Sequence, residues 1–272
     1  MFSEKWMQFL QTSSVYSNLW REYSERGVSE ILDLSDKENS FSTDFHFQHY
    51  FDVGANALEI IVQALIAGRR LPPQSILDFP SGSGRVTRHL RAMFPNARIG
   101  TCDLYQQHLD FCAAHFGAVP LVSKENLDEL DVGQWDLVFC GSLLTHLPEH
   151  LFWPTIRFIC RSLTPTGIAI VTLEGRHALH IQDHKWKFIE DDLFDIAREQ
   201  YHASGFGFVD YNPAFRASAF HKQASYGIAL VNPSWLMAGL QKMDDVRIMS
   251  FVERCWDDHQ DVIVFGKPGV ND

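Results

Sequence analysis

Residues 75–104 contain a short apolar strand, a glycine-bearing turn, a helix and a second strand in close succession. The first strand ends on Asp78, and the turn 79–84 (FPSGSG) follows it directly. Apolar residues at helical spacing occupy 86–94, and the second strand ends on Asp103. Two strands joined by a helix pair in parallel, so this unit predicts an α/β fold with a mostly parallel sheet.

The residue types in this turn narrow the range of ligands that it can bind. Gly82 and Gly84 allow a ligand to approach the backbone closely, and Asp103, 19 residues after Gly84, is placed to accept ribose hydroxyls. Thr87 stands where a dinucleotide fingerprint has its third glycine, and no phosphate-loop lysine is present. Asp78 would repel a pyrophosphate. It favours a ligand that carries a cation there, such as the sulfonium of S-adenosylmethionine (SAM).

The pattern Asp-x-x-x-Gly-x-Gly with a later strand-end acid resembles the class I SAM-dependent methyltransferases. Pro80 stands where the family has its first glycine and removes one backbone N–H donor. The tracts 135–147 (WDLVFCGSLLTHL) and 163–172 (LTPTGIAIVT) and a terminal strand hairpin are similar to further features of that family.

The resemblance implies a seven-stranded, mostly parallel, doubly wound sheet whose last strand is antiparallel. It places an N-terminal helical cap at 1–73 and a SAM-binding core at 74–272. An acceptor-side insertion follows the fifth strand at 174–226. Its aromatic residues and Gly205, Gly207 and Gly227 are interpreted as a lid that can move.

The resemblance also implies a set of cofactor-binding residues. Asn126 and Leu127 lie in the loop after the third strand, which holds the adenine in the family; an ordinary acidic loop is the alternative interpretation. The candidate cofactor-binding residues are Asp78, Pro80, Gly82, Gly84, Arg85, Asp103, Leu104, Asn126, Leu127, Gly141 and Ser142.

An oxygen nucleophile must lose its proton, so a general base is sought among three polar residues. His146 is the first candidate because it follows the fourth strand and has an unperturbed pKa near 6.5. His259 in the terminal hairpin and Glu174 at the end of the fifth strand are the others. Each is alternatively a polar residue lining a rim. The spacing of His177, His180 and His184 fits one helical face, but the chain holds 13 histidines and no metal is expected.

Composition restricts the partners and the location. The 34 acidic and 23 basic residues give a formal charge of −11, which disfavours nucleic acid. Five scattered cysteines indicate reduced core thiols, and the N-terminus does not resemble a signal peptide. No apolar run is judged to approach 18 residues. The chain is therefore expected to be cytoplasmic and not to span a membrane.

The elements outside this core are predicted from periodicity and turn residues. A helix is expected to begin on Pro154, and residues 164–167 are expected to form a turn. The other expected elements are helices at 1–24, 54–68, 106–116, 190–203 and 232–243, a loop at 25–48, and strands at 119–123, 135–140, 168–173, 226–231, 246–253 and 261–266.

The expected activity is transfer of the SAM methyl group to a small-molecule acceptor, at oxygen or nitrogen. A glycan and a secondary-metabolite precursor are the acceptor classes considered, and self-association is left open. A nicotinamide-dependent oxidoreductase is the alternative enzyme, and Thr87 and Asp78 argue against it. A non-catalytic SAM-binding protein is a third interpretation, because fold does not fix catalytic residues.

Overall fold

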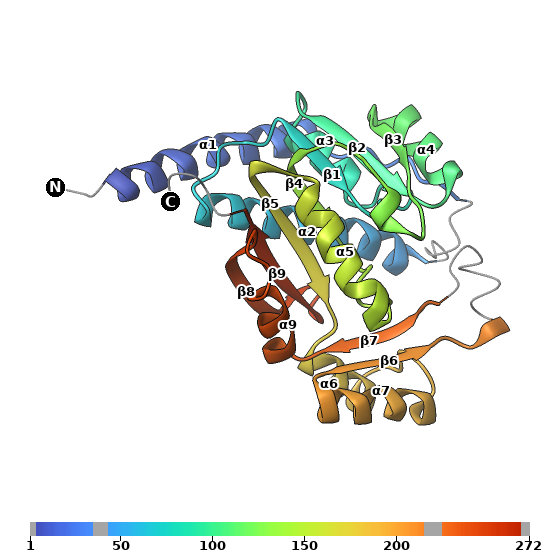
Figure 1. Cartoon of the computed structure of the whole chain (residues 1–272). Helices are drawn as coiled ribbons and strands as arrows, with labels where there is room; N and C mark the ends of the chain where they lie inside the picture. The colour runs from blue at the N-terminus through green and yellow to red at the C-terminus, as the bar shows by residue number, and fades with distance from the viewer. Residues whose placement is uncertain (1–3, 35–42, 215–224, 268–272) are drawn as a thin grey trace. The chain divides into compact units, whose positions relative to one another are not determined.

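The computed structural model describes residues 4–34, 43–214 and 225–267 (Figure 1). The strands are β1 (Ser75–Asp78), β2 (Arg98–Asp103), β3 (Val119–Val122), β4 (Trp135–Cys140), β5 (Leu163–Leu173), β6 (Phe206–Asp210), β7 (Gly227–Val231), β8 (Arg247–Trp256) and β9 (Gln260–Gly266). The helices are α1 (Glu4–Arg26), α2 (Asp44–Ala67), α3 (Thr87–Met93), α4 (Gln106–Phe116), α5 (Glu149–Arg161), α6 (Arg176–His184), α7 (Asp191–Ser204) and α9 (Pro233–Leu240), and η1 (Leu127–Glu129) is a short 3-10 helix.

The expected fold class is confirmed. A seven-stranded sheet has the order β3-β2-β1-β4-β5-β9-β8, and β6 and β7 form a separate two-stranded sheet. The last strand, β9, runs antiparallel to both of its neighbours. The chain forms two compact units, one of residues 1–122 with 135–139 and one of residues 123–134 with 140–272. The expected division at residue 73 stays a prediction.

The first unit is built on parallel strands. β1 pairs in parallel with β2 on one side and with β4 on the other, and β2 pairs in parallel with β3. Ile76 and Leu77 are fully buried, as expected for a strand covered on both faces. Helix α4 has the predicted bounds. It ends at Gly117, whose left-handed φ of 61° suits a glycine C-cap.

Helix α2 begins ten residues before the predicted helix at 54–68. Thr43 caps its first turn by accepting a hydrogen bond from the His46 N–H, so the predicted loop at 25–48 is too long. Part of that loop, 35–42, lies outside the described residues. With 24 residues and a mean hydropathy of 1.3 over its best window, α2 is long and apolar enough to cross a membrane. The expectation that no apolar stretch reaches such a length is wrong; 56% of that window is buried in the structure.

In the second unit, one helix and one strand begin at residues other than those predicted. Helix α5 begins at Glu149, and Pro154 lies inside it rather than at its first position. The helix extends toward its N-terminus because Phe152 is fully buried there, which outweighs the hydrogen bond that a proline removes. Strand β5 begins at Leu163, so the predicted turn at 164–167 belongs to the strand.

The insertion after β5 has a core of its own. Helix α6, which was not predicted as a helix, and α7 pack with the β6–β7 pair; these segments lie together in Figure 1. Because β7 pairs with β6, this packed part extends past the predicted boundary at residue 226. Phe215 and Phe220, included in the predicted lid, lie outside the described residues. The core residues are Ala178, Ile189, Phe194, Ala197, Tyr201, Ile228 and Leu230.

The glycines of the insertion allow close packing, and their interpretation as points of movement stays a prediction. A Cβ on Gly207 would lie 1.8 Å from the Ala197 carbonyl oxygen, and one on Gly227 would lie 1.8 Å from the Val209 carbonyl oxygen. Gly205 takes a left-handed φ of 88° to end α7. The lid itself stays a prediction.

Candidate active site

The glycine turn of the first unit leaves one open approach to its backbone. Gly82 has a φ of 49°, and a Cβ built on it would have no heavy atom within 4 Å. Gly84 has a φ of 82°, but a Cβ there would lie 2.5 Å from the ring of Phe116. Gly84 is therefore required for packing against α4, whereas Gly82 leaves space for a ligand.

Asp103 holds this turn in place. Its carboxylate accepts a hydrogen bond from the Gly82 N–H through Oδ2 and one from the Tyr105 N–H through Oδ1, each at 2.9 Å. The buried His108 ring places Nδ1 3.5 Å from Oδ1. Each carboxylate oxygen can accept a second hydrogen bond, so the role predicted for Asp103 toward a ribose remains available. Its role in fixing the turn was not predicted.

Asp78 is 1% exposed and accepts a 2.6 Å hydrogen bond from the Thr87 hydroxyl. Burial raises the pKa of its carboxyl to about 7; the Thr87 hydrogen bond opposes the shift and the negative Asp103 adds to it. Thr87, noted in the sequence as a missing glycine, is thus the partner of this acid. A ligand cation near Asp78 would favour its ionised form, which suits the prediction made for it.

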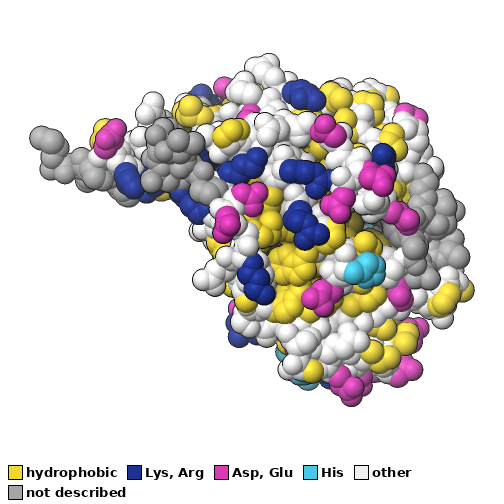
Figure 2. Space-filling model, in the orientation of Figure 1, with side chains coloured by type: hydrophobic (Ala, Val, Ile, Leu, Met, Phe, Trp, Pro, Cys, Tyr) yellow, Lys and Arg dark blue, Asp and Glu magenta, His cyan; other side chains and the backbone are white. Residues whose placement is uncertain are grey.

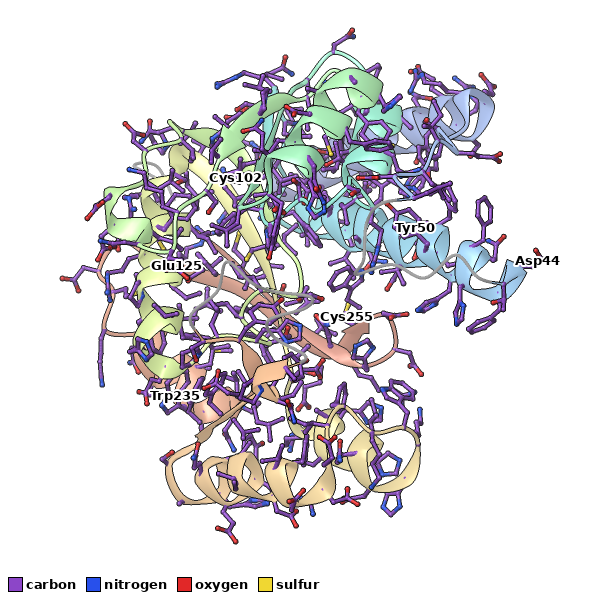
Figure 3. All side chains as sticks on the ribbon, turned by 90° about the vertical axis from the view of Figure 1, so that its right-hand side faces the viewer. Asp44, Tyr50, Cys102, Glu125, Trp235 and Cys255 are labelled. Carbon is purple, nitrogen blue, oxygen red and sulfur yellow. The ribbon has the colours of Figure 1, made fainter. Side chains whose placement is uncertain are left out.

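Two arginines of the first unit, Arg85 and Arg88, lie over the Tyr50 ring of α2. The Arg85 guanidinium lies 5.1 Å from the centre of the Tyr50 ring, which is labelled in Figure 3. Arg88 is 1% exposed and donates to the carbonyls of Ser29 and Ile31. Sequence reasoning missed Arg88 because a buried arginine looks like any surface residue in the sequence. The cofactor roles of Arg85, Pro80 and Leu104 stay predictions.

A second polar cluster lies in the second unit, where β4 and β5 end. Ser142, with a φ of 54°, donates its N–H to the Thr172 hydroxyl at 2.8 Å, and its own Oγ accepts from the Gln260 amide at 2.9 Å. This strained backbone is held from two sides, as is common near functional sites. Gly141 precedes Ser142. The cofactor roles of both stay predictions.

His146 is fixed by the insertion. Its Nδ1 lies 2.7 Å from the Gly227 carbonyl oxygen, which can only accept, so Nδ1 carries the proton and Nε2 is left as an acceptor. The Tyr211 hydroxyl lies 3.3 Å from the same Nδ1, and the Tyr226 ring stacks on the imidazole at 4.7 Å. Burial lowers the pKa of His146 to about 4. His146 therefore does not have the pKa near 6.5 that made it the first candidate base, and its imidazole is neutral at pH 7.

Glu174 and His259, predicted as separate candidates, lie together. The Glu174 carboxyl is 3% exposed, and its Oε1 lies 3.5 Å from His259 Nε2. Burial raises the pKa of Glu174 well above its usual value, and Asp261 and Asp257 raise it further. The Tyr211 hydroxyl lies against His146, and its pKa is raised by burial and by the charge of Glu174. Glu174 and His259 thus belong to one cluster, whereas His146 is held by Gly227, Tyr211 and Tyr226.

Asn126 and Leu127 are engaged locally. The Asn126 side chain accepts from the Asp128 N–H and donates to Glu129, which caps η1. Leu127 is 7% exposed. This geometry agrees with the ordinary-loop alternative, and the adenine contact stays a prediction.

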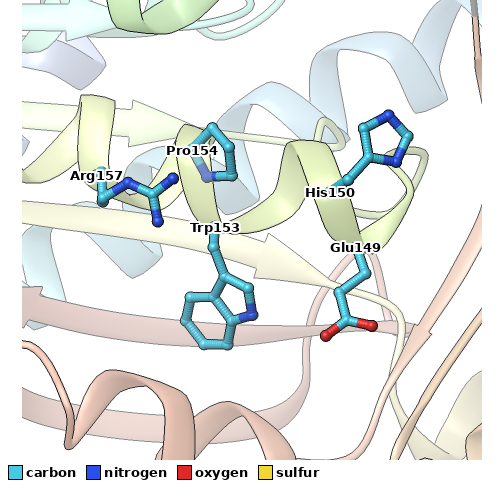
Figure 4. A pocket seen from close by; sticks show the side chains of 5 residues that line it. All are labelled: Glu149, His150, Trp153, Pro154 and Arg157. Carbon is cyan, nitrogen blue, oxygen red and sulfur yellow. The ribbon is translucent and has the colours of Figure 1, made fainter.

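Two further features of the second unit contain none of the candidate residues. The rings of His177, His180 and His184 lie next to one another on α6, and within the described residues no three His, Cys, Asp or Glu side chains are grouped to hold a metal. A shallow groove of about 550 Å³ runs along α5, as Figure 4 shows. Its lining residues are Glu149, His150, Trp153, Pro154 and Arg157.

Residues 77–169 match the family model described as methyltransferase domain. This part of the chain is a methyltransferase domain. It contains Asp78, the glycine turn, Asp103 and His146, whereas Glu174 and His259 lie beyond its matched end. The match agrees with the resemblance seen in the sequence.

Three similar solved structures share the fold at low identity. The DhpI–SAM–HEP complex is 17% identical, covers 98% of this chain and 100% of its own, and has a TM-score of 0.51. A SAM-dependent methyltransferase from Clostridium acetobutylicum is 14% identical, with 84% and 93% covered and a TM-score of 0.51. A Burkholderia thailandensis 1,6-didemethyltoxoflavin-N1-methyltransferase, bound to that substrate and S-adenosylhomocysteine, is 12% identical, with 98% and 91% covered and a TM-score of 0.51. No curated protein matches the chain.

Proposed function

We propose that the chain transfers the methyl group of SAM to a small-molecule acceptor. The observation that carries this proposal is the methyltransferase domain at 77–169, whose glycine turn is held by Asp103 and follows directly after the buried Asp78. The names of the similar structures add support, because they include SAM and S-adenosylhomocysteine complexes and a small-molecule substrate.

The residues of the glycine turn fit SAM. Gly82 would allow the ligand to approach the backbone, Asp103 would accept the ribose hydroxyls, and Asp78 would face a cationic part of the ligand. When bound, SAM supplies a methyl group already activated on a sulfonium. The residues of the chain then have to bind SAM and the acceptor, orient them, and exclude water.

The second polar cluster is proposed to receive the acceptor. His146 Nε2 is free to accept a hydrogen bond, because Nδ1 donates to Gly227. Glu174, whose pKa is raised by burial, is the acid of this cluster best suited to take up a proton. We therefore assign His146 to orientation and Glu174, next to His259, to proton transfer.

The remaining partners are proposals too. A glycan or a secondary-metabolite precursor is retained as the acceptor class, and the five free cysteines support a cytoplasmic location. Figure 2 shows basic and acidic side chains interspersed on one face, which supports the proposal that nucleic acid is not the acceptor. A nicotinamide-dependent enzyme is less well supported, because a buried acid beside the turn does not suit a pyrophosphate.

Calorimetry with S-adenosylhomocysteine tests the cofactor assignment. Asp103→Asn keeps the side-chain volume but removes the charge from its hydrogen bonds, each worth about 1.5–3 kcal/mol. We expect an affinity at least about tenfold weaker. Asp110→Asn, an exposed acid of α4, is the matched control and should bind like wild type. Unchanged affinity in a folded Asp103→Asn variant would contradict the assignment.

A further inference from the structure

The buried polar groups around His259 contain acceptor oxygens that the chain does not satisfy. Glu174, Gln260 and Asp261 are 3%, 6% and 1% exposed, respectively. Within the described residues, Glu174 Oε2, Gln260 Oε1 and Asp261 Oδ2 have no hydrogen-bond partner. Buried acceptors are rarely left unpaired, so the free oxygens of Glu174 and Gln260, whose side chains both lie next to His259, indicate a donor that comes from outside the chain.

These side chains are brought together by the antiparallel pairing of β5 with β9. Leu173 is opposite Asp261 in the register, which places Glu174 and Gln260 at the same end of the two strands. The Glu174 carboxyl and the Gln260 amide each lie 3.5 Å from His259 Nε2. Because His259 Nδ1 donates to the Asp257 carbonyl, Nε2 of the neutral ring is an acceptor as well.

Among the described residues, neither Glu174 nor Asp261 forms an ion pair with a lysine or arginine. Arg176 is paired with Glu253 at 2.5 Å, and Arg254 is paired with Asp258 at 2.7 Å. Lys185 lies 4.0 Å from Asp258. Asp257 adds a further negative charge near Glu174. Burial favours the protonated form of Glu174, and a cation bound here would supply the counter-ion that its ionised form needs.

Aromatic rings lie beside the acids. Trp186 meets the His259 ring edge to face with centres 5.9 Å apart, and the Phe188 ring lies 6.3 Å from it. Tyr211 lies close enough to Glu174 for that acid to raise the pKa of its hydroxyl. Acids next to aromatic rings are the surroundings that favour an ammonium group attached to an apolar body.

We propose that Glu174 and Gln260, reinforced by the charge of Asp261, bind the protonated amino group of an amine acceptor. The proposal rests on the proposed function and specifies nitrogen as the atom that is methylated. Before it can act as a nucleophile, the ammonium must give one proton to a Glu174 carboxylate oxygen; the N–H electron pair stays on nitrogen, and the carboxylate becomes a carboxylic acid. His259 Nε2 lies next to Glu174 and can accept that proton in turn.

Paired amines and alcohols test this inference in the full chain with S-adenosylhomocysteine present. The probes are methylamine with methanol, benzylamine with benzyl alcohol, and phenethylamine with 2-phenylethanol, each titrated by calorimetry at pH 7 and constant ionic strength. For at least one pair, wild type should bind the amine about tenfold or more tightly than the alcohol, as expected for a charge-assisted contact.

Glu174→Gln should abolish this preference, and Glu199→Gln, an exposed acid of α7, should keep it. Asp261→Asn should weaken the preference without reversing it. If no amine binds better than its alcohol, or if Glu174→Gln keeps the preference, the inference is overturned and water satisfies the buried oxygens. Binding of S-adenosylhomocysteine without amine preference would overturn this inference alone. Amine preference without S-adenosylhomocysteine binding would overturn the proposed function.

Discussion

Replacement of Asp78 by asparagine should stabilise the protein in the absence of ligand. Asp78 is 1% exposed, and its carboxyl has a pKa of about 7 against an ordinary 3.8. The folded state therefore keeps a proton that the unfolded chain loses between these two values. Stability falls as the pH rises through this window, because ionising the buried acid costs free energy.

The magnitude follows from the shift. A difference of about three pKa units corresponds to about 4 kcal/mol at 1.36 kcal/mol per unit, reached above pH 7. Asp78→Asn removes this penalty and keeps an amide oxygen that can accept the 2.6 Å hydrogen bond from Thr87. The gain over wild type should thus grow from near zero at pH 4 to at most about 4 kcal/mol at pH 8.

Urea unfolding at pH 4.5, 6 and 8 measures this gain. Glu174 and Asp261 also have raised pKa values, but they titrate in both proteins and cancel in the difference. The control Asp110→Asn should show no comparable trend. A gain that is equal at pH 4.5 and pH 8, or a variant less stable than wild type at pH 8, would refute the reasoning. Affinity for SAM should fall in the same variant, because the buried acid lowers the stability of the protein but serves binding.

Two other predictions concern the second unit. His146→Ala should lower turnover severalfold or more while S-adenosylhomocysteine affinity, measured by calorimetry, stays within about twofold, because His146 lies among Tyr211, Tyr226 and Gly227; an equal fall in both would disprove an acceptor-side role. Gly207→Ala should destabilise the protein by about 1–3 kcal/mol in urea unfolding, because its Cβ would lie 1.8 Å from the Ala197 carbonyl oxygen; a cost near zero would show that β6 moves freely.

The sequence by itself determined the class of fold and pointed to the acids and glycines that are proposed to bind the cofactor. Local signals were sufficient there: buried parallel strands are continuous apolar runs, and Gly117 ends α4 where the pattern stops. The acids Asp78 and Asp103 and the glycines between them were found because strand ends and tight turns are encoded within a few residues. Boundaries failed where tertiary packing prevailed, as at Pro154, which burial of Phe152 keeps inside α5.

Only the tertiary structure decided the arrangement of the residues proposed for the acceptor side, and their electrostatics. His146 meets Gly227, 81 residues away, because β7 returns along the segment after β4. Glu174, Gln260 and His259 meet because β5 and β9 pair in one register. The pKa values of Asp78, His146 and Glu174 depend first on burial, which is a property of the packed chain and not of neighbours in sequence. These residues can be picked out in the sequence, but it is long-range packing that brings them together and buries them away from water.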